Sequence, residues 1–392
     1  MAEVLNTNNS MAELKNSKTL TPSHSGLEDM VATESSICFI DGPRSRLIYR
    51  GYSINDLANQ TIFEEIIYLL LFKKLPNSQE LKAFSQQLAQ ERKCPEKFIE
   101  RMNSIPKTIH PMTVLRTMVS ALAFFDPDAD QVNFDSNLKK SIKSIAQIPT
   151  IIAAWDRIRN GKTPVEPDQN LTHSENFLYM LSGKKPEPLS AEAFNLYLVL
   201  LADHELNAST FALRVTASTL SDYYSGITTA IGALKGPLHG GANEQVLKML
   251  LEVGAVSNVG TYLETAFKEK KKVMGFGHRV YKALDPRSPL LKEMAEKVCK
   301  KTGNEKLFEI SKKIEGIVTQ AKKLPSNVDF YSATLLYCVG IPIDLFTPMF
   351  VMSRIAGWSA HYLEQIGDNR LIRPRAEYRG ALDLPFISIE NR

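Results

Sequence analysis

The sequence predicts an all-α fold, and three observations point to it. Apolar residues recur at helical spacing along most of the 392-residue chain, for example over residues 81–88. Helix-start signals precede such runs, as where Asn77 is followed three positions later by Glu80, the pattern of a capping box. Only residues 37–51 carry the short β-branched and aromatic runs around an Asp-Gly-Pro turn that indicate a β-hairpin. We therefore expect helices throughout, with one minor hairpin near the N-terminus.

The helices follow in order from the same signals. The first clear one begins after Asn77, and Pro111 occupies a first-turn position ahead of the next apolar run, which Asp126 and Pro127 end. The apolar stripe over residues 142–155 contains Pro149, which predicts a kinked helix that stops at Gly161. Further helices are expected at residues 191–203, 208–223, 243–251, 288–301, 304–322, 332–339 and 348–365.

The composition excludes several classes of protein. With 44% apolar and 23% charged residues, the chain has the composition of a soluble globular protein rather than of a disordered one. The net charge of +4 is small and no basic stripe is present, so we expect no nucleic acid partner. The longest apolar stretch, residues 194–202, is far shorter than the ~18 residues of a membrane span, so we expect no membrane partner.

The cysteines and the first residues bear on location. The four cysteines are far apart and form no CxxC pattern, which suggests reduced thiols and a cytoplasmic protein. Residues 1–25 are rich in Asn, Ser and Thr and contain neither arginine nor an apolar core. They fit neither a secretory signal nor a transit peptide, and we expect them to form a flexible tail.

Several familiar catalytic motifs are absent. Residues 275–277 are Gly-Phe-Gly but lack the third glycine of a dinucleotide fingerprint, and residues 161–163 lack the earlier glycine of a P-loop. The seven histidines are at least 31 residues apart, so no helix offers two metal ligands on one face. No serine lies in a GxSxG elbow, and no cysteine is identified as a nucleophile. We therefore expect neither a metal nor a covalent nucleophile.

Two histidines instead lie in glycine-rich turns. His239 is bracketed by Gly-Pro and Gly-Gly pairs, which let a ligand approach the backbone closely, although a buried histidine bonded to carbonyls would fit equally well. His278 shares a short segment with Arg279, Lys282 and Arg287. Three cations beside one imidazole suit a substrate with carboxylates or phosphates, and the alternative is a solvated basic surface.

Four other polar residues have ordinary explanations when taken singly. His204 follows a strongly apolar run, where a core histidine is the commoner case, and Asp329 precedes a helix that it could simply cap. If Asp329 is buried instead, its pKa rises toward neutrality, which suits a general base. Arg354 and Arg373 could be surface arginines.

Taken together, six segments resemble successive blocks of the citrate synthase family. The resemblance covers nearly the whole chain from residue 26 onward, and the order and spacing of the segments match. The segments are LLADHELNAST (200–210), KGPLHGGANE (235–244), GFGHRVYKALDPR (275–287), NVDFYSATLL (327–336), FTPMFVMSRIAGWSAH (346–361) and RLIRPRAEYRG (370–380).

The resemblance implies that acetyl-CoA and oxaloacetate condense to citryl-CoA, which is hydrolysed to citrate and CoA without a metal or other cofactor. On this sequence, the family pattern makes Asp329 the base that deprotonates the acetyl methyl group. His239 then donates a hydrogen bond to the thioester oxygen, and His278 polarises the oxaloacetate carbonyl. A carboxylate alone is too weak a base to deprotonate a thioester methyl group, so the reaction needs further stabilisation. An aligned oxyanion donor contributes roughly 2.7–4 kcal/mol, and alignment of the substrates contributes about 7–11 kcal/mol.

The resemblance also implies which residues hold the substrates. His204, Arg287 and Arg354 would bind the oxaloacetate carboxylates, and Arg373 would reach the same site from the partner subunit, so a homodimer is implied. The coenzyme A contacts would come from one loop and two later cations: Lys272, Val273, Met274, Gly275, Phe276, Gly277, Arg279 and Lys282.

By the same resemblance, the chain has a large helical domain and a smaller helical domain inserted into it. The large domain comprises residues 26–240 and 334–392, and the small domain comprises residues 241–333 with the catalytic and coenzyme-binding loops. This arrangement places His239 at a hinge and the active site in the gap, where closure would exclude water from the reacting groups.

Two other interpretations remain. A 2-methylcitrate synthase uses propionyl-CoA within the same fold, and one methylene is worth only ~1–3 kcal/mol of discrimination, although the GHRVYK segment looks more like the citrate enzymes. A non-catalytic helical scaffold descended from such an enzyme is the more remote interpretation. It predicts the loss of His239, His278 or Asp329, and all three are present.

Overall fold

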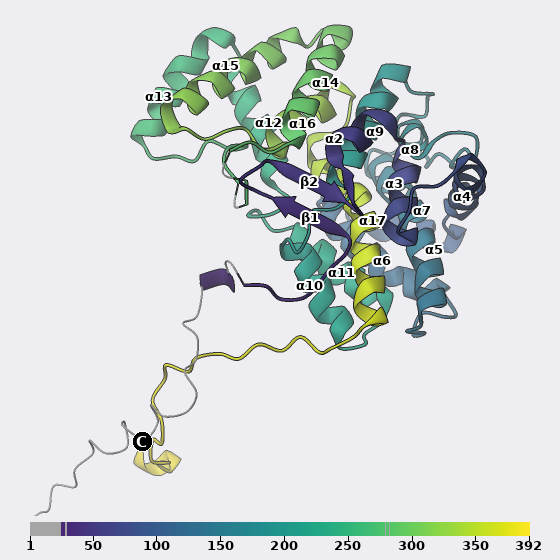
Figure 1. The fold of residues 1–392 in the computed structure, drawn as a ribbon, viewed down its shortest axis with the longest axis vertical. Coiled ribbons are helices and arrows are strands. Elements are labelled where there is room, and N and C mark those ends of the chain that lie inside the picture. Colours follow the sequence, from purple (N-terminus) through teal and green to yellow (C-terminus); the bar gives the residue numbers. More distant parts are fainter. Residues whose placement is uncertain (1–24, 28–29, 279, 282) are drawn as a thin grey trace, which may run out of the picture. The chain divides into compact units, whose positions relative to one another are not determined.

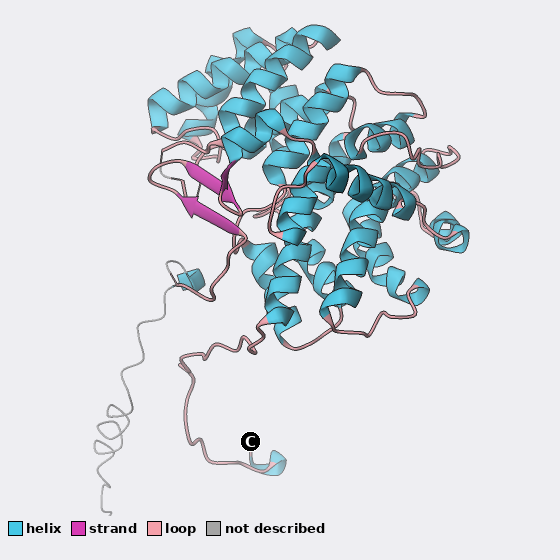
Figure 2. Ribbon diagram, turned by 45° about the vertical axis from the view of Figure 1, so that its right-hand side comes forward, coloured by secondary structure: helices cyan, strands magenta, loops and turns pink. Residues whose placement is uncertain are grey.

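The computed structural model describes residues 25–27, 30–278, 280–281 and 283–392 and confirms the all-α fold (Figures 1 and 2). The α-helices in these residues are α2 (Ile54–Gln60), α3 (Phe63–Phe72), α4 (Ser78–Glu91), α5 (Glu96–Glu100), α6 (Pro111–Ala121), α7 (Phe134–Arg159), α8 (His173–Ser182), α9 (Pro188–Leu201), α10 (Ala208–Ser218), α11 (Tyr223–Leu234), α12 (Ala242–Val253), α13 (Val259–Lys268), α14 (Arg287–Thr302), α15 (Glu305–Lys322), α16 (Val328–Cys338) and α17 (Phe346–Gly367). Short 3₁₀ segments are η2 (Ser25–Leu27), η3 (Arg101–Ser104), η4 (Leu122–Phe125), η5 (Val256–Asn258), η6 (Ile343–Leu345) and η7 (Ile389–Asn391).

The predicted hairpin is confirmed and extended by a third strand. Strand β1 (Cys38–Asp41) pairs antiparallel with β2 (Arg46–Tyr49), which pairs antiparallel with β3 (Tyr52–Ser53). The turn of the hairpin lies against the loop that follows His278: a Cβ at Gly42 would meet the Val280 carbonyl oxygen at 2.3 Å. The hairpin therefore packs against the segment that follows His278.

Two helix predictions are corrected by the structure. The predicted helix over residues 208–223 is wrong beyond residue 218, because Leu220 adopts a left-handed backbone with φ 61° and Asp222 caps a new helix, α11. The predicted helix at 332–339 begins earlier, at Val328, because the side chain of Asn327 caps it. Pro149 lies inside α7, which runs on to Arg159.

Helix α17 forms the centre of the larger group of helices. It packs against α3, α7, α9, α10 and α11, and nearly all of its side chains are buried, including Trp358. Figure 1 shows it in yellow, running between these helices. Because its neighbours surround α17 on every side, it forms the core of this group of helices.

Helices α12 to α16 form a second group, shown in green tones in Figure 1. Helix α16 packs on α12, α14 and α15, and α13 packs on α15. The core of this second group includes Val246, Leu291 and Phe330, which are fully buried. The boundary expected between residues 333 and 334 falls inside α16.

The structure divides the chain into two units. One consists of residues 36–372 and contains all of these helices and strands except η2 and η7. The other consists of residues 1–35 and 373–392, in which the described stretches carry exposed apolar side chains such as Tyr378 and Phe386. Of the tail expected over residues 1–25, all but Ser25 lies outside the described residues.

Two further observations concern the described residues as a whole. Their helices include none that is both long enough and apolar enough to cross a membrane. All four cysteines are buried and free, and the Sγ atoms of Cys299 and Cys338 are 3.0 Å apart.

Candidate active site

His239 lies in the tight turn between α11 and α12. The turn is closed by two backbone bonds, from His239 N to Gly236 O at 2.9 Å and from Gly240 N to Leu234 O at 2.9 Å. Only glycine fits at position 240, because a Cβ there would meet Leu234 O at 2.5 Å. Burial and the charge of Arg354 lower the pKa of His239 to about 4. The imidazole is therefore neutral at pH 7 and can donate a hydrogen bond without being a cation.

Ser209 holds the imidazole of His239. Its Oγ donates to Asn207 Oδ1 at 2.7 Å, accepts a hydrogen bond from Trp358 Nε1 at 3.2 Å and lies 2.9 Å from Nε2 of His239. The hydroxyl has one proton, and by rotating it can donate to Nε2 of His239 instead of to Asn207. When it gives the proton to Nε2, the neutral imidazole keeps its own proton on Nδ1, where a ligand can use it.

The ring of His278 has its tautomer fixed by the backbone. Its Nδ1 accepts hydrogen bonds from the backbone N–H of Val280 at 3.0 Å and of Tyr281 at 3.2 Å. An acceptor nitrogen bears no proton in the neutral ring, so Nε2 is the nitrogen that carries it. His278 thus offers one N–H donor in a fixed direction.

His204 lies beside His278 in a cluster of three rings. The centroids of the two imidazoles are 5.3 Å apart, the Tyr281 ring contacts both, and Nε2 of His204 lies 3.3 Å from the Tyr281 hydroxyl. His204 is buried, and burial together with the positive charge of Arg287 lowers its pKa well below the ordinary value. It is a neutral hydrogen-bonding group.

Asp329 is the second residue of α16. Its backbone N–H is capped by the side chain of Asn327 at 3.0 Å, which starts the helix at this point. Burial raises the pKa of Asp329 to about 6, against the lowering effect of the Arg287 and Arg354 charges. A carboxylate with that pKa is ionised at neutral pH and is a stronger base than an exposed aspartate.

A loop clasp joins the segment before His278 to the start of α16. We use this name for residues 275–277 and 325–327. Asn327 N donates to Gly275 O at 3.0 Å, Gly277 N donates to Pro325 O at 3.0 Å, and Asn327 Nδ2 donates to Gly277 O at 2.9 Å. Gly275 has φ 84°, and a Cβ there would lie 2.8 Å from the Phe330 ring, so the clasp requires glycine at this position.

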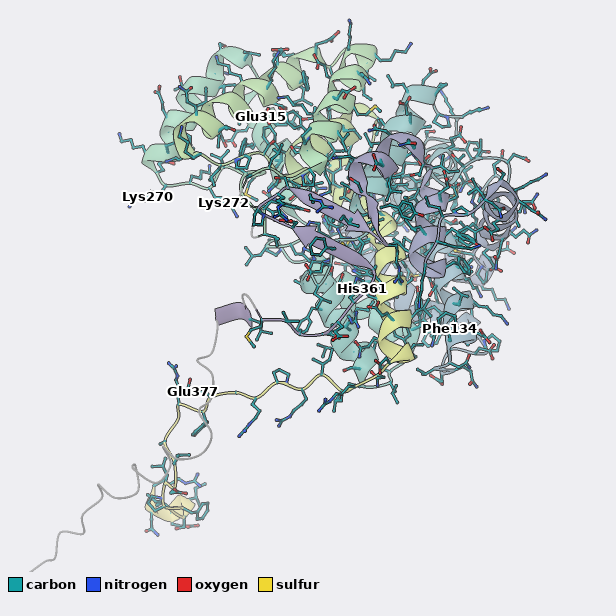
Figure 3. The ribbon with its side chains drawn as sticks, viewed as in Figure 1. Phe134, Lys270, Lys272, Glu315, His361 and Glu377 are labelled. Atoms are coloured by element: carbon teal, nitrogen blue, oxygen red, sulfur yellow. The ribbon has the colours of Figure 1, made fainter. Side chains whose placement is uncertain are left out.

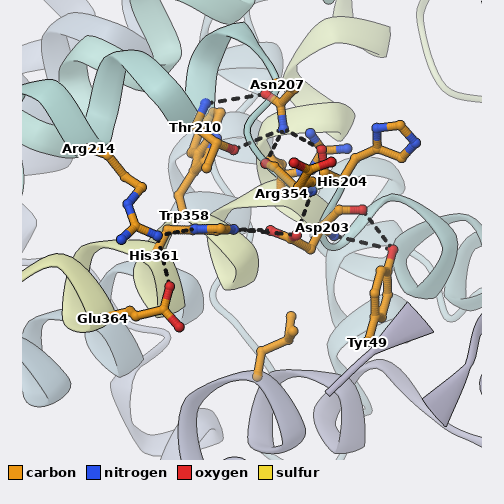
Figure 4. A network of polar contacts seen from close by, with 12 residues as sticks. Tyr49, Asp203, His204, Asn207, Thr210, Arg214, Arg354, Trp358, His361 and Glu364 are labelled. Atoms are coloured by element: carbon orange, nitrogen blue, oxygen red, sulfur yellow. Dashed lines mark hydrogen bonds and ion pairs between the residues drawn. The ribbon is translucent and has the colours of Figure 1, made fainter. Parts of the chain in front are cut away.

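Two buried arginines complete the site. Arg287 makes a two-pronged contact with Asp285, Nε to Oδ1 at 2.9 Å and Nη2 to Oδ2 at 2.8 Å, and Asp285 also accepts from the backbone N–H of Val328 at 3.2 Å. Arg354, labelled in Figure 4, donates from Nε to Leu201 O at 2.7 Å. Both guanidinium groups are almost completely buried, an environment that favours pairing with carboxylates.

The structure brings six of the predicted residues together. The charge of Arg354 acts on His204, His239 and Asp329, the charge of Arg287 acts on His204 and Asp329, and His278 contacts His204. They come from α14, α16, α17 and the loops between helices.

The other predicted residues are placed differently. Arg373 is exposed and belongs to the second unit. Lys272 is exposed on the loop after α13, near Lys270 (Figure 3), and Val273 and Met274 are half-buried beside it. Arg279 and Lys282 lie outside the described residues.

Two other features of the described residues do not belong to this site. A cavity of about 500 Å³ is lined by the end of α2, the start of α8, the first half of α9 and the middle of α14, and none of the predicted residues lines it. No group of three or more His, Cys, Asp or Glu side chains in the described part of the chain could hold a metal ion. The described residues of the site supply a carboxylate, imidazoles and guanidinium groups.

Several contributing residues were missed by the sequence analysis. Tyr281 contacts His204, Ser209 contacts His239, and Trp358 donates to Ser209. In the sequence, each of the three resembles an ordinary helix or core residue. Asp285 carried a usable signal, because an aspartate immediately before Pro and two positions before a helical arginine is a typical helix start.

Comparison with known proteins supplies the family. The model of the citrate synthase C-terminal domain family matches residues 26–375. Citrate synthase 2 of Bacillus subtilis is 53% identical over 94% of this chain and 98% of its own length, and the citrate/2-methylcitrate synthase of that organism is 40% identical over 91% and 96%. A citrate synthase of Thermoplasma acidophilum, solved as a ternary complex with carboxymethyl coenzyme A and oxaloacetate, has a TM-score of 0.88 and 35% identity over 93% and 98% of the two chains. Because the match spans nearly the whole chain in both sequence and structure, this chain belongs to the citrate synthase family.

Proposed function

We propose that the protein condenses acetyl-CoA with oxaloacetate and hydrolyses the citryl-CoA that forms, with Asp329, His239 and His278 as the catalytic residues. The observation that carries the assignment is a half-buried carboxylate with a pKa near 6 on which the charges of two buried arginines act. The charge of one of them, Arg354, also acts on the neutral imidazole of His239. This set can remove a proton from a weak carbon acid and stabilise the oxygen that becomes negative, without a metal.

The first step is proton abstraction from the acetyl methyl group. A C–H bond breaks, its proton moves to the Asp329 carboxylate, and the electron pair forms the C=C bond of an enol whose thioester oxygen gains negative charge. A neutral His239 donates a hydrogen bond to that oxygen. A donor aimed at a developing oxyanion contributes roughly 2.7–4 kcal/mol to a reaction of this kind.

In the second step the enol carbon attacks the keto carbon of oxaloacetate. A C–C bond forms from the C=C electrons of the enol, and the carbonyl of the thioester forms again. The electrons of the oxaloacetate C=O bond move to its oxygen, which the Nε2–H of His278 would stabilise and which takes up a proton to become the hydroxyl of citryl-CoA. Water then cleaves the thioester of citryl-CoA to release CoA and citrate. The fixed tautomer of His278 supports this role, because the donor needs no rearrangement.

Oxaloacetate would be held by its carboxylates. Arg354 uses Nε on the backbone of Leu201, and among the described residues no acceptor contacts its two terminal nitrogens, which can bind a carboxylate. Arg287, held by Asp285, and His204 complete the set. The ternary complex of the T. acidophilum enzyme with oxaloacetate and a coenzyme A analogue supports these substrates.

For coenzyme A, we propose the loop comprising Lys272, Val273, Met274, Gly275, Phe276 and Gly277, with Arg279 and Lys282 as candidates for its phosphates. Exposed Lys272 and the left-handed glycines at 275 and 277 favour a segment that binds a ligand with its backbone. Residues 241–333 would move as a small domain to close over the substrates, which would exclude water until condensation is complete.

The acyl substrate can be tested directly. Thiol release measured with acetyl-CoA should require oxaloacetate, and its kcat/KM should exceed that with propionyl-CoA by about tenfold or more. A preference for propionyl-CoA would instead identify a 2-methylcitrate synthase, an interpretation that the 40% identical citrate/2-methylcitrate synthase keeps open. No thiol release with either substrate would favour the non-catalytic scaffold.

We also propose a cytoplasmic homodimer in which Arg373 completes the partner's oxaloacetate site. The buried free thiols support the location. Support for the dimer comes from apolar side chains that the end of the chain exposes and that a second copy could cover. They are Tyr378, Leu382, Leu384, Phe386 and Ile389.

The shared site predicts complementation between two inactive variants. When Arg373→Ala and Asp329→Asn proteins exchange subunits, half of the dimers are mixed and each mixed dimer has one intact site, so about a quarter of wild-type activity should return. Thiol release after mixing measures it, with each variant alone as the control. Mixtures no more active than the separate variants would show that Arg373 acts within its own subunit or not at all.

A further inference from the structure

A chain of buried charged side chains runs behind the loop that carries His204 (Figure 4). His361 of α17 lies in its middle, with Nε2 3.2 Å from Asp203 Oδ2 and Nδ1 3.2 Å from Arg214 Nη1. Neither His361 nor Asp203 exposes any measurable surface. None of these three residues has a part in the mechanism above.

The contacts of His361 determine which nitrogen carries its proton. An arginine side chain has only donors, so Nδ1 of His361 must accept from Arg214 and bears no proton. The proton is then on Nε2, directed at the Asp203 carboxylate. Arg214 is fixed in turn by Glu364 at 2.8 Å and Gln365 at 2.9 Å, so the direction of the whole chain is set.

Asp203 uses its carboxylate to hold the loop in an unfavourable backbone conformation. Glu205 has φ 52°, a left-handed conformation that costs a non-glycine residue free energy, and its N–H donates to Asp203 Oδ1 at 3.0 Å. His204 is the residue between them, so its direction depends on this turn. The Tyr49 hydroxyl also donates to the Asp203 carbonyl at 2.9 Å.

The carboxylate of Asp203 has no room to take another position. Gly357 of α17 packs so closely that a Cβ there would lie 2.2 Å from Asp203 Oδ2 and 2.4 Å from Ala202 O. The backbone N–H of Gly357 donates to Ala202 O at 3.1 Å, which keeps α17 against the loop. With glycine at this position, the rotation of the carboxylate is fixed by the N–H of Glu205 on Oδ1 at 3.0 Å together with Nε2 of His361, which lies 3.5 Å from Oδ1 and 3.2 Å from Oδ2.

From this geometry we infer that Asp203 and His361 are positioning residues for oxaloacetate binding, which act by holding the His204 loop, with Arg214 setting the tautomer of His361. The inference rests on the proposed function, because it assigns oxaloacetate to the His204 side of the site. If the inference holds, the affinity for oxaloacetate, and not that for acetyl-CoA, depends on the hydrogen bond that Nε2 of His361 donates to the Asp203 carboxylate.

Two substitutions at position 361 separate the two contacts. In His361→Gln the side-chain N–H₂ can replace Nε2 and donate to Asp203, whereas the shorter amide of His361→Asn can replace only Nδ1 and accept from Arg214. We expect the oxaloacetate Kd, measured by calorimetry, to rise about tenfold in His361→Asn and to stay within about threefold of wild type in His361→Gln. The KM for acetyl-CoA should stay within about twofold in both.

Asp203→Asn, alone and combined with His361→Gln, tests the Asp203 side of this contact. In Asp203→Asn the amide places N–H₂ against the His361 proton if its oxygen stays on Glu205, so the oxaloacetate Kd should rise about a hundredfold. Adding His361→Gln should recover at least tenfold of this loss, because the glutamine amide can turn its oxygen toward the N–H₂ that Asp203→Asn introduces. Thermal unfolding of each protein checks that the sites are compared in folded chains.

The results decide between positioning and a purely structural role. Equal oxaloacetate Kd values for His361→Gln and His361→Asn, or an equal weakening of acetyl-CoA and oxaloacetate binding, would overturn the inference. If His361→Asn does not fold, the double variant decides by itself. The inference is then overturned if adding His361→Gln to Asp203→Asn does not restore oxaloacetate binding. The proposed function fails differently, through a wild-type protein that binds oxaloacetate but releases no thiol from any acyl-CoA.

Discussion

Replacing Asp329 with asparagine should lower kcat for thiol release about 10³-fold while the protein remains folded and still binds oxaloacetate. Asparagine has nearly the same shape but cannot accept the methyl proton, and general bases contribute typically 10²–10⁴-fold. Initial-rate assays of thiol release and calorimetric binding of oxaloacetate measure the two quantities separately. The exposed Asp368 offers a matched control, because Asp368→Asn removes a carboxylate outside the site.

The same variant should be more stable than the wild type. Burial raises the pKa of Asp329 from 3.8 to about 6, so the folded protein binds this proton more tightly than the unfolded chain does. Between about pH 4 and pH 6 the unfolded chain loses the proton first, and stability therefore falls as pH rises through this window. At about 1.36 kcal/mol per pH unit, the neutral asparagine should add about 3 kcal/mol to the free energy of unfolding at pH 8 and nothing at pH 3.

Activity should follow the same carboxylate in the opposite sense. The base must be ionised, so kcat/KM for the wild type, which reports the free enzyme, should fall as pH drops through about 6, and the residual kcat/KM of Asp329→Asn should lack this dependence. Wild-type rates that stay constant down to pH 5, or an Asp329→Asn variant that is active, would remove Asp329 from the role of base.

Replacing His239 with alanine should lower kcat by about 10²–10³, the cost of one oxyanion-hole donor. The loss should appear mainly in kcat, because the enol oxygen that His239 would stabilise carries its charge only after the proton has moved. The pKa of about 4 predicts that His239 contributes no titration between pH 6 and pH 8. Steady-state kinetics across that range measure both effects.

Two companion variants sharpen this second test. Ser209→Ala leaves His239 in place but removes the hydroxyl at 2.9 Å from its Nε2, and we expect a loss of about tenfold in kcat. His110→Asn is the control, because asparagine can still cap α6, where His110 Nδ1 accepts from Met112 N. A His239→Ala enzyme with normal kcat and raised KM would show that this imidazole only binds substrate.

Local signals predicted much of the fold. Asn77 and Glu80 do form the reciprocal capping box at the start of α4, with bonds of 2.9 and 3.0 Å. The same kind of reasoning missed α11, because Gly226 and Gly232 inside it resemble loop residues. A contact from far along the chain explains Gly226, since a Cβ there would lie 3.1 Å from the Tyr362 ring. Sequence spacing cannot show such packing.

The site divides in the same way. His239 and His278 stand out because glycines surround them, and their turns can be recognised from a few neighbouring residues. Asp203 and His361 are 158 positions apart and look like a helix-end acid and a core histidine. Only the packing of α17 against the loop after α9 brings them into contact, so no local pattern could have paired them.

If residues 272–277 bind coenzyme A as proposed, the loop clasp couples coenzyme binding to the placement of Asp329. Because residues 275–277 are bonded to residues 325–327, a shift of the peptide that would cradle the adenine end of the coenzyme drags the first turn of α16 along with it. Binding of the large, unreactive part of the thioester would thereby orient the proposed base, Asp329, toward the acetyl group. A truncated acyl thioester would not shift this loop, so Asp329 would not be oriented toward its methyl group.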